Sequence, residues 1–432
     1  MLSKKHKIEL DESIIEEFDK AVNEQKHISM QKHFSSKKYG GLCAWDCICV
    51  CIHRIRDTVG YLNDMELGSM SHGNAFDFME FVNCSAIVID SVSMLAEIFC
   101  VDLIEEDART AVFSQLGADG EGTDKKYFEF LRSLCVVHPM KTNRHGRYQG
   151  SDLVSCAFIT WSNETIRMAF NDCDLHANAF VNDANSWGDS VEIYIDQVFS
   201  YVEYRYGLLS KVKSGLVRYQ QATIEAFKAR PVLPKGAEES DGAYLVRLKC
   251  EEHDRFGNGN AFAFDFAREI LAFEPTNPAN HLLVERFKNA WRFAIELERS
   301  ALCNMTHCGC ENAGIDDDTG WTLFENLDEC YVHHPDLKVF DYHLEKLHYL
   351  DGTHSENDAM WGRLKFDEMR HVFETRAVLD DCIGDHELYL LACAVLYEMA
   401  LEVPGPINDA IPQSPEFRKG IDNRESRVIV DD

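Results

Sequence analysis

A one-sided pattern of apolar residues near the N-terminus predicts a long amphipathic helix. The apolar positions recur at steps of three and four, at Trp45, Ile48, Ile52, Ile55, Val59 and Leu62. Such steps return to the same side of a helix, so these side chains form one continuous face. The next apolar segment, Phe76–Cys100, carries apolar residues around much of its circumference, which predicts a helix at the centre of a bundle. A shorter helix is expected around Glu105–Leu116, and a further helix begins near Phe128.

The pattern changes after residue 150, where apolar and polar residues alternate. Leu153–Thr160 and Thr165–Phe170 lie on either side of a short turn and predict a hairpin, and Ser190–Ile195 predicts a further strand. We interpret this β insertion as a structural flap. Helical spacing returns over Gln197–Ala229. The cations of this segment form either a second RNA-facing surface or, as is more usual, a solvated helix face; they are Arg205, Lys211, Lys213, Arg218, Lys228 and Arg230.

Helices dominate the rest of the chain. The linker at residues 230–242 contains Pro231 and Pro234, followed by acidic residues and glycine, and marks a domain boundary. Helices are expected beyond it at Ala261–Phe273, Leu282–Leu302, Tyr342–Leu350, Asp358–Leu379 and His386–Leu401. An amphipathic helix is also expected near the N-terminus, at Leu10–Val22.

The predicted fold is therefore mainly α, in four parts. Residues 1–40 form an N-terminal helical arm and linker, and residues 41–150 form a helical bundle. Residues 151–230 form a small β insertion followed by a long helix, and residues 231–432 form an all-α C-terminal domain.

The composition indicates an acidic globular protein. Of 432 residues 45% are hydrophobic, and the formal net charge is −30. Because phosphate binding needs clustered lysine and arginine, this balance excludes a general nucleic-acid coat but leaves room for one small basic cleft. The first residues lack the apolar core of a signal peptide, and no run approaches the ~20 apolar residues of a membrane span. Sixteen cysteines without a secretory signal indicate reduced thiols, so we expect a cytoplasmic protein without membrane association.

The sign of the charge reverses in one segment, residues 128–148. Arg132 and His138 have five residues between them on the predicted helix, which ends before Pro139. A basic strip follows, formed by Lys141, Arg144, His145 and Arg147. Six positions along a helix rotate through about 600° and rise roughly 9 Å. The two side chains therefore line one cleft only if the last helical turn loosens.

These residue types suit metal-free cleavage of RNA. Histidine exchanges a proton near neutral pH, and arginine stays charged and holds phosphate with a planar fork. In this hypothesis His138 acts on the 2′-hydroxyl or the leaving 5′-oxygen, and Arg132 stabilises the charged phosphorane. The basic strip binds the substrate.

A structural interpretation competes with the catalytic one. Arg132 then pairs with an acid such as Glu129, and His138 caps a helix end. A second arginine and histidine at the same spacing, Arg247 and His253, have two glutamates between them and no basic strip after them. We interpret that second pair as a coincidence, because so short a motif recurs by chance.

The order of these elements resembles the HEPN family. A long helix, a buried long helix and a final helix with RSLCVVH followed by TNRH carry the resemblance, which covers about residues 41–148, a third of the chain. It implies a helical bundle with the family's Arg–x4–6–His motif at Arg132 and His138. It also implies a metal-independent endoribonuclease that leaves a 2′,3′-cyclic phosphate, as a homodimer in which each protomer contributes its own motif. Such proteins commonly act on tRNA or other structured RNA in bacterial toxin–antitoxin or antiphage systems.

Two further positions follow from the family pattern. The residue after the arginine, often polar in the family, is Ser133 here. A polar or acidic residue on an earlier helix sometimes assists, and Asp90 and Glu97 are the candidates.

Cysteine-rich stretches supply the metal candidates. A candidate structural zinc site comprises Cys303, His307, Cys308 and Cys310, whose residue types suit zinc. No catalytic metal or other cofactor is expected, and the sequence contains no GxxxxGK[ST] phosphate-binding loop. Cys43, Cys47 and Cys51 recur every four residues on the first long helix, which favours packing as small apolar residues.

The alternative function is non-catalytic. A HEPN-like helical scaffold or sensor would engage a protein partner or trigger through its C-terminal domain and acidic surface. The enzyme, by contrast, needs Arg132 and His138 in one basic, solvent-open groove.

Overall fold

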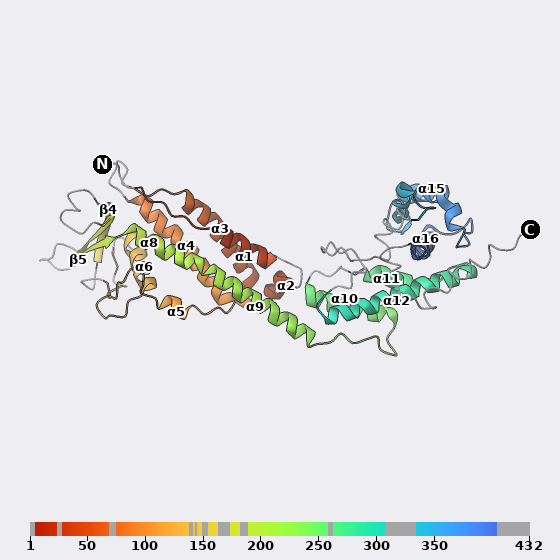
Figure 1. The fold of residues 1–432 in the computed structure, drawn as a ribbon, viewed down its shortest axis with the longest axis horizontal. Helices are drawn as coiled ribbons and strands as arrows, with labels where there is room; N and C mark the ends of the chain where they lie inside the picture. The colour runs from red at the N-terminus through yellow and green to blue at the C-terminus, as the bar shows by residue number, and fades with distance from the viewer. Residues whose placement is uncertain are drawn as a thin grey trace, which may run out of the picture. The chain divides into compact units, whose positions relative to one another are not determined.

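The computed structural model describes residues 5–23, 28–68, 75–137, 141–142, 145–148, 154–162, 173–181, 189–257, 262–306 and 334–403. The fold is mainly helical with small antiparallel sheets, which confirms the predicted fold class. The chain divides into two compact units, residues 1–24 with 29–222 and residues 25–28 with 223–432 (Figure 1).

The first unit is a helical bundle that carries a sheet. Its helices are α1 (Ser13–Asn23), α2 (Met30–Ser35), α3 (Ala44–Asp64), α4 (Phe76–Ile98), α5 (Ile104–Asp107), α6 (Asp124–Arg132), α8 (Ile195–Gly207) and α9 (Leu209–Lys228). The predicted stripe on α3 is confirmed, because Ile48, Ile55 and Leu62 are fully buried. The α3 cysteines Cys47 and Cys51 are buried as well, as expected for core packing.

Helix α4 is the central helix of this bundle. It packs against α3, α6 and α8 and buries Phe78, Val82, Val88 and Leu95. By length and composition alone α4 could cross a membrane, so the prediction that no segment approaches a membrane span is wrong for α4. However, 56% of its apolar window is buried inside the protein. That burial is what a core helix of a soluble bundle requires.

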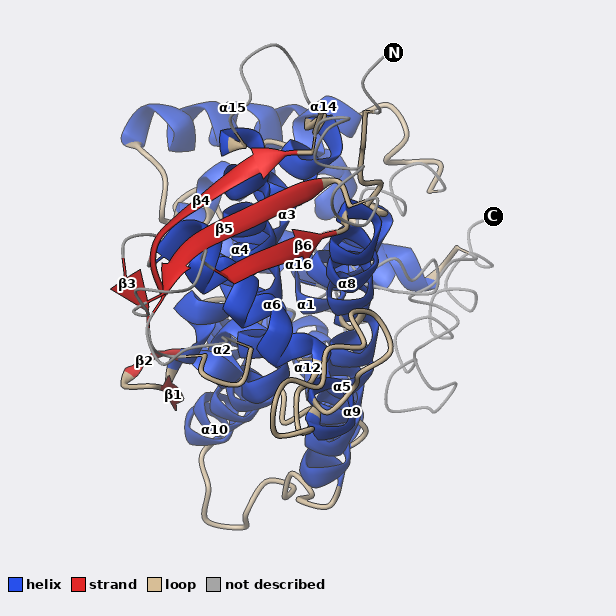
Figure 2. Cartoon of the chain, turned by 90° about the vertical axis from the view of Figure 1, so that its left-hand side faces the viewer, coloured by secondary structure: helices blue, strands red, loops and turns tan. Residues whose placement is uncertain are grey.

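The sheet of the first unit has the order β3-β4-β5-β6 and is antiparallel. Its strands are β3 (Lys141–Thr142), β4 (Val154–Trp161), β5 (Leu175–Val181) and β6 (Asp189–Ile193), and the last three lie side by side in Figure 2. A two-stranded ribbon of β1 (Lys38–Tyr39) and β2 (Leu42–Cys43) precedes α3. Strands β4 and β6 correspond to predicted strands, whereas β5 was not predicted. The predicted strand Thr165–Phe170 lies outside the described residues.

Two predicted helices differ from the observed ones. The helix expected around Glu105–Leu116 is limited to α5, because the Asp124 carboxylate accepts hydrogen bonds from the backbone N–H groups of Val112 and Phe113. These bonds replace helical ones, and Phe113 packs against Tyr127. The helix expected over Gln197–Ala229 is two helices, α8 and α9, with a break at Leu208.

The second unit is helical throughout the part that the structure describes. Its helices are α10 (Asp241–Phe256), α11 (Phe264–Ala272), α12 (His281–Cys303), α14 (Asp341–Leu344), α15 (Glu356–Phe373) and α16 (Asp385–Leu401), with 3-10 turns η2 (Pro278–Asn280) and η3 (Leu347–Leu350). Helix α12 packs against α10, α11 and α16. The division between the two units falls within α9, and the domain boundary expected at residue 231 stays a prediction.

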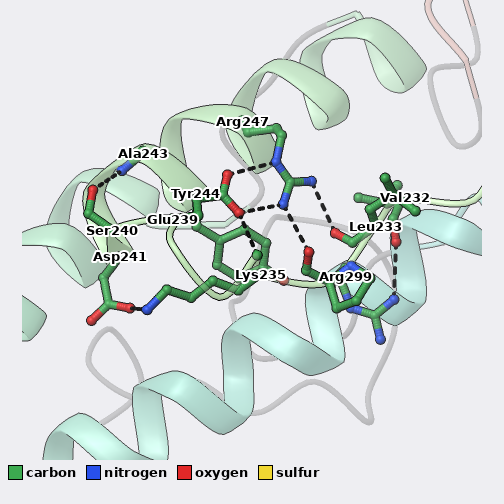
Figure 3. A network of polar contacts seen from close by, with 12 residues as sticks. Val232, Leu233, Lys235, Glu239, Ser240, Asp241, Ala243, Tyr244, Arg247 and Arg299 are labelled. Atoms are coloured by element: carbon green, nitrogen blue, oxygen red, sulfur yellow. Dashed lines mark hydrogen bonds and ion pairs between the residues drawn. The ribbon is translucent and has the colours of Figure 1, made fainter.

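The linker between α9 and α10 is held by arginine side chains (Figure 3). Arg247 donates to the carbonyls of Leu233 and Pro234 at 3.0 and 3.2 Å and to the Glu239 carboxylate at 2.9 Å. Arg299 donates to the carbonyl of Val232 at 3.2 Å. These bonds satisfy carbonyls of a segment whose two prolines cannot form a regular helix. The segment therefore is an ordered part of the second unit.

Removal of the Arg247 side chain is expected to open this linker. Arg247→Ala deletes four hydrogen bonds to the segment 233–239, so local opening becomes more frequent and a protease that prefers apolar residues cuts there severalfold faster. Arg292→Ala is the matched control, because Arg292 contacts only Glu285 and Asn289 of its own helix among the described residues. Equal cleavage of the two variants would contradict the role assigned to Arg247.

The acidity of Glu239 reports on the same contacts. The hydrogen bond from Arg247, aided by the Gly236 N–H, lowers the pKa of Glu239 to about 2. Its stabilising contribution is therefore fully present above the unfolded pKa of about 4.3 and is lost progressively as the pH falls from there through about 2. At about pH 3.5 the carboxylate should be ionised in the parent and mostly protonated in Arg247→Ala. Carbon-13 NMR of glutamate carboxyls, assigned with Glu239→Gln, measures this; an unchanged pKa in Arg247→Ala would refute it.

Candidate functional site

Arg132 is the last residue of α6, and the helix continues beyond it in a different form. The Thr123 hydroxyl caps α6 at its start by accepting from the Lys126 N–H. After Arg132 the chain makes a π-helical turn, η1 (Ser133–Val137), in which each residue rotates less than in an α-helix. Turns of this kind recur at functional sites. His138 lies outside the described residues, so its position relative to Arg132 stays a prediction.

The Arg132 guanidinium contacts Asp90 on α4. Nη1 donates to Asp90 Oδ2 at 3.2 Å, and the two side chains are 34% and 68% exposed. Arg132 thus pairs with an acid, as the structural interpretation holds, but with Asp90 on another helix and not with Glu129. The Nε atom of Arg132 is buried and has no hydrogen-bond partner in the described part of the chain. An ion pair this exposed contributes about 0–1 kcal/mol, so Asp90 holds the guanidinium only weakly.

The structure distinguishes the two acidic candidates on α4. Asp90 faces Arg132, whereas Glu97 accepts a hydrogen bond from the Tyr39 hydroxyl at 2.5 Å. That hydrogen bond, together with burial, raises the pKa of Tyr39 to about 12. Of the two acids, Asp90 is therefore the one placed to act with Arg132.

A second acid, Glu129, lies one helical turn before Arg132. Its side chain keeps access to solvent, yet partial burial among its neighbours raises its pKa. The negative charges of Asp107 and Asp90 raise the pKa further, and Lys125 opposes them. The surroundings of Arg132 thus contain one acid that is more readily protonated than a free glutamate.

A buried hydrogen-bond network centred on Arg205 connects the helices next to Arg132. Arg205 on α8 is 1% exposed and donates to Asp107 Oδ1 at 2.5 Å and to Ser93 Oγ at 3.2 Å. Burial opposes ionisation of Asp107, but the hydrogen bonds from Arg205 and Lys125 outweigh it and lower the pKa. The interpretation of Arg205 as part of an RNA-facing or solvated surface is therefore wrong. Arg205 ties α8 to α4 and α5, because a buried guanidinium must be paired.

The described residues of the basic strip contact α6 and the loop that precedes it. The His145 ring meets the Phe130 ring edge-on at 5.8 Å between centroids. Arg147 bonds Asp119 at 2.8 Å and lies 3.9 Å from Glu121, so acids compensate its charge. The strip thus adds less free positive charge than its sequence predicts.

The other members of the strip are less completely described. The backbone of Lys141 belongs to β3 and pairs with Ser155 of β4. Arg144 lies outside the described residues. Because β4 contacts η1, the sheet lies beside the turn that follows Arg132.

The basic strip lies so close to residues 117–121 that position 117 must be a glycine. Gly117 has a φ of +71°, and an added Cβ would lie 2.2 Å from Arg147 Cγ. The backbone N–H of Ala118 donates to the Arg147 carbonyl at 2.9 Å. Residues 117–121 and the strip are therefore fixed to one another.

The candidate zinc site is not assembled in the described residues. Cys303 Sγ lies 3.3 Å from the backbone nitrogen of Val232, and His307, Cys308 and Cys310 fall outside the described ranges. Within those ranges no three histidine, cysteine, aspartate or glutamate side chains converge as metal ligands would. The zinc assignment stays a prediction.

Comparisons with known proteins give no further assignment. No protein-family model matches the sequence, and no curated protein or solved structure matches it either.

Proposed function

We propose that the protein is a metal-independent endoribonuclease of the HEPN type. Arg132 binds the scissile phosphate and stabilises the charge that develops on it, and His138 moves the proton. The product is a 2′,3′-cyclic phosphate. The working form is a homodimer in the cytoplasm of a bacterium, where cleavage of tRNA or another structured RNA serves toxin or antiphage defence.

The observation that carries the proposal is the state of Arg132. Its guanidinium stands at the end of a helix, is 34% exposed, and is held in the described part of the chain by one carboxylate that is itself largely exposed. A fully structural arginine is held differently: Arg205 is buried and bonds both an acid and a hydroxyl. A partly exposed arginine with one weakly held carboxylate suits a phosphate oxygen, which accepts charge-assisted hydrogen bonds strongly.

The acidic body fits a selective enzyme. With a net charge of −30 the protein repels polyanions at a distance, so RNA without a complementary shape is disfavoured. Cleavage then depends on substrate that reaches Arg132 in a fixed orientation.

One specific observation favours the scaffold alternative. Both described arginines of the segment, Arg132 and Arg147, already pair with acids. If these pairs persist in solution with RNA present, the helical bundle serves as a binding surface for a protein partner or trigger.

Asp90→Asn separates the two proposals. Loss of an exposed partner should change the free energy of unfolding by less than about 1 kcal/mol. If Asp90 competes with phosphate for Arg132, the KM for RNA falls severalfold while the fold is unchanged. Steady-state cleavage and urea unfolding of the variant provide the measurements, with Asp46→Asn on the exposed start of α3 as control.

The direct test is incubation of purified protein with total RNA in excess EDTA. The nuclease should cut in the chelator, because His138 and Arg132 supply the chemistry. Cleavage that stops in EDTA would contradict the metal-independent mechanism. Absence of cleavage of any RNA by the folded dimer would favour the scaffold.

A further inference from the structure

Four polar side chains on or next to β4, β5 and β6 form a continuous run of hydrogen bonds. Ser162 follows β4, Cys173 precedes β5, His176 is the second residue of β5 and Ser190 lies in β6. The Ser162 hydroxyl lies 3.4 Å from Cys173 Sγ, and Cys173 Sγ lies 2.8 Å from His176 Nε2. His176 Nδ1 in turn lies 3.2 Å from Ser190 Oγ.

The sheet register brings these groups together. Ser190 pairs with Asn178, two residues along β5 from His176, so His176 and Ser190 lie on the same face of the sheet. A backbone hydrogen bond of 2.9 Å from Ser162 N to the Asp174 carbonyl joins the end of β4 to the start of β5 next to Cys173. The thiol and the imidazole are thus held by the strand pairing itself.

Burial defines the resting state of the pair. Cys173 is 0% exposed and His176 is 2% exposed, whereas Ser190 reaches the surface. Burial raises the pKa of Cys173 and lowers the pKa of His176, so both groups rest in their neutral forms. In the tautomer that carries the ring proton on Nδ1, facing Ser190 Oγ, His176 Nε2 accepts a hydrogen bond from the Cys173 thiol.

We propose that Cys173 is a site of oxidation by a small, uncharged two-electron oxidant of the hydrogen peroxide class, with His176 as its base. The arrangement contains the three parts of an activated nucleophile: a thiol, a base within hydrogen-bond reach and a third group that orients the base. Burial of Cys173 disfavours large or charged electrophiles, so the proposed oxidant is a small neutral one. This inference does not depend on RNA cleavage.

The reaction balances with peroxide as the only added reagent. The Cys173 sulfur attacks one peroxide oxygen, so an S–O bond forms and the O–O bond breaks. His176 Nε2 accepts the thiol proton and passes it to the departing hydroxide, which leaves as water. The sulfur is oxidised to sulfenic acid by two electrons, and the peroxide is reduced.

The test compares cysteines within one full-length chain. The folded protein is treated with a limiting amount of hydrogen peroxide and is then unfolded in urea that contains dimedone, so that the trap reaches sulfenic acid at buried cysteines as well. Each cysteine is quantified by mass spectrometry. Cys135 is the internal control, because it is 1% exposed and burial raises its pKa to about 12, without a histidine partner among the described residues. Cys173 should be labelled at least about tenfold faster than Cys135. This is a lower bound, because a positioned general base typically accelerates a reaction by about 100-fold or more.

Variants assign the effect to His176. His176→Gln should lower labelling of Cys173 to the rate of Cys135, while His354→Gln in the second unit should leave it unchanged. Equal labelling of Cys173 and Cys135 in the parent overturns the proposal, as does a parental rate in folded His176→Gln. If His176→Gln does not fold, the ratio of Cys173 to Cys135 in the parent decides alone.

Discussion

Alanine in place of Arg132 or His138 is expected to lower RNA cleavage by at least about 100-fold while the helical fold is kept. The arginine supplies charge that strengthens only as the phosphorane forms, and the histidine supplies the proton transfer. Removal of the Arg132 side chain should change the free energy of unfolding little, because its ion pair with Asp90 is largely exposed. Cleavage of a defined RNA gives the rate, and circular dichroism gives the helix content.

The chain contains its own control for this experiment. Arg247 and His253 repeat the spacing of Arg132 and His138, but Arg247 holds the linker through Glu239 and two carbonyls. Arg247→Ala should therefore keep full RNA cleavage. Parental cleavage by the Arg132→Ala, His138→Ala double variant would exclude the assigned mechanism.

Loss of one partner from the buried pair Arg286–Glu398 is expected to destabilise the second unit by about 3–5 kcal/mol. Arg286 on α12 and Glu398 on α16 are 10% and 7% exposed and form a direct ion pair. Arg286→Met leaves a buried carboxylate without this partner, which costs far more than an exposed pair gains. Hydrogen exchange of α12 and α16 peptides should accelerate, while α3 and α4 peptides stay as in the parent.

The double variant Arg286→Met, Glu398→Leu separates charge from packing. Removal of both charges should restore most of the lost protection, because the buried carboxylate is gone. If the double variant exchanges as fast as Arg286→Met, the pair acts mainly through shape. If Arg286→Met itself exchanges like the parent, Glu398 is not held by Arg286.

Helix periodicity predicts the bundle well but cannot assign contacts between distant segments. The α3 stripe from Trp45 to Leu62 identifies a helix and its buried face, because the period is a local property. The end of α5 is set by Asp124, which bonds Val112 and Phe113 from beyond the loop. Strand β5 escapes prediction because LHANAFV contains alanine and asparagine, residues that seldom favour strands, and is held by pairing on both sides.

The candidate site shows the same limit. The sequence identifies Arg132 by charge reversal and suggests an acid such as Glu129 as its partner, while Asp90 and Glu97 are only candidates for an assisting acid on an earlier helix. Only the packing of α4 on α6 places Asp90 at the guanidinium. Likewise Arg205 has the sequence context of a surface cation and becomes a core residue through Asp107, which lies 98 positions away.

The chemistry at the cut ends of RNA tests the central claim most directly. Purified protein is incubated with total RNA in EDTA, and the new termini are mapped by sequencing that distinguishes a 2′,3′-cyclic phosphate from a 3′-hydroxyl. The account predicts cyclic phosphate and 5′-hydroxyl ends with the parent and none above background with the Arg132→Ala, His138→Ala variant. Ends that carry a 3′-hydroxyl and 5′-phosphate, or identical ends from both proteins, would contradict it.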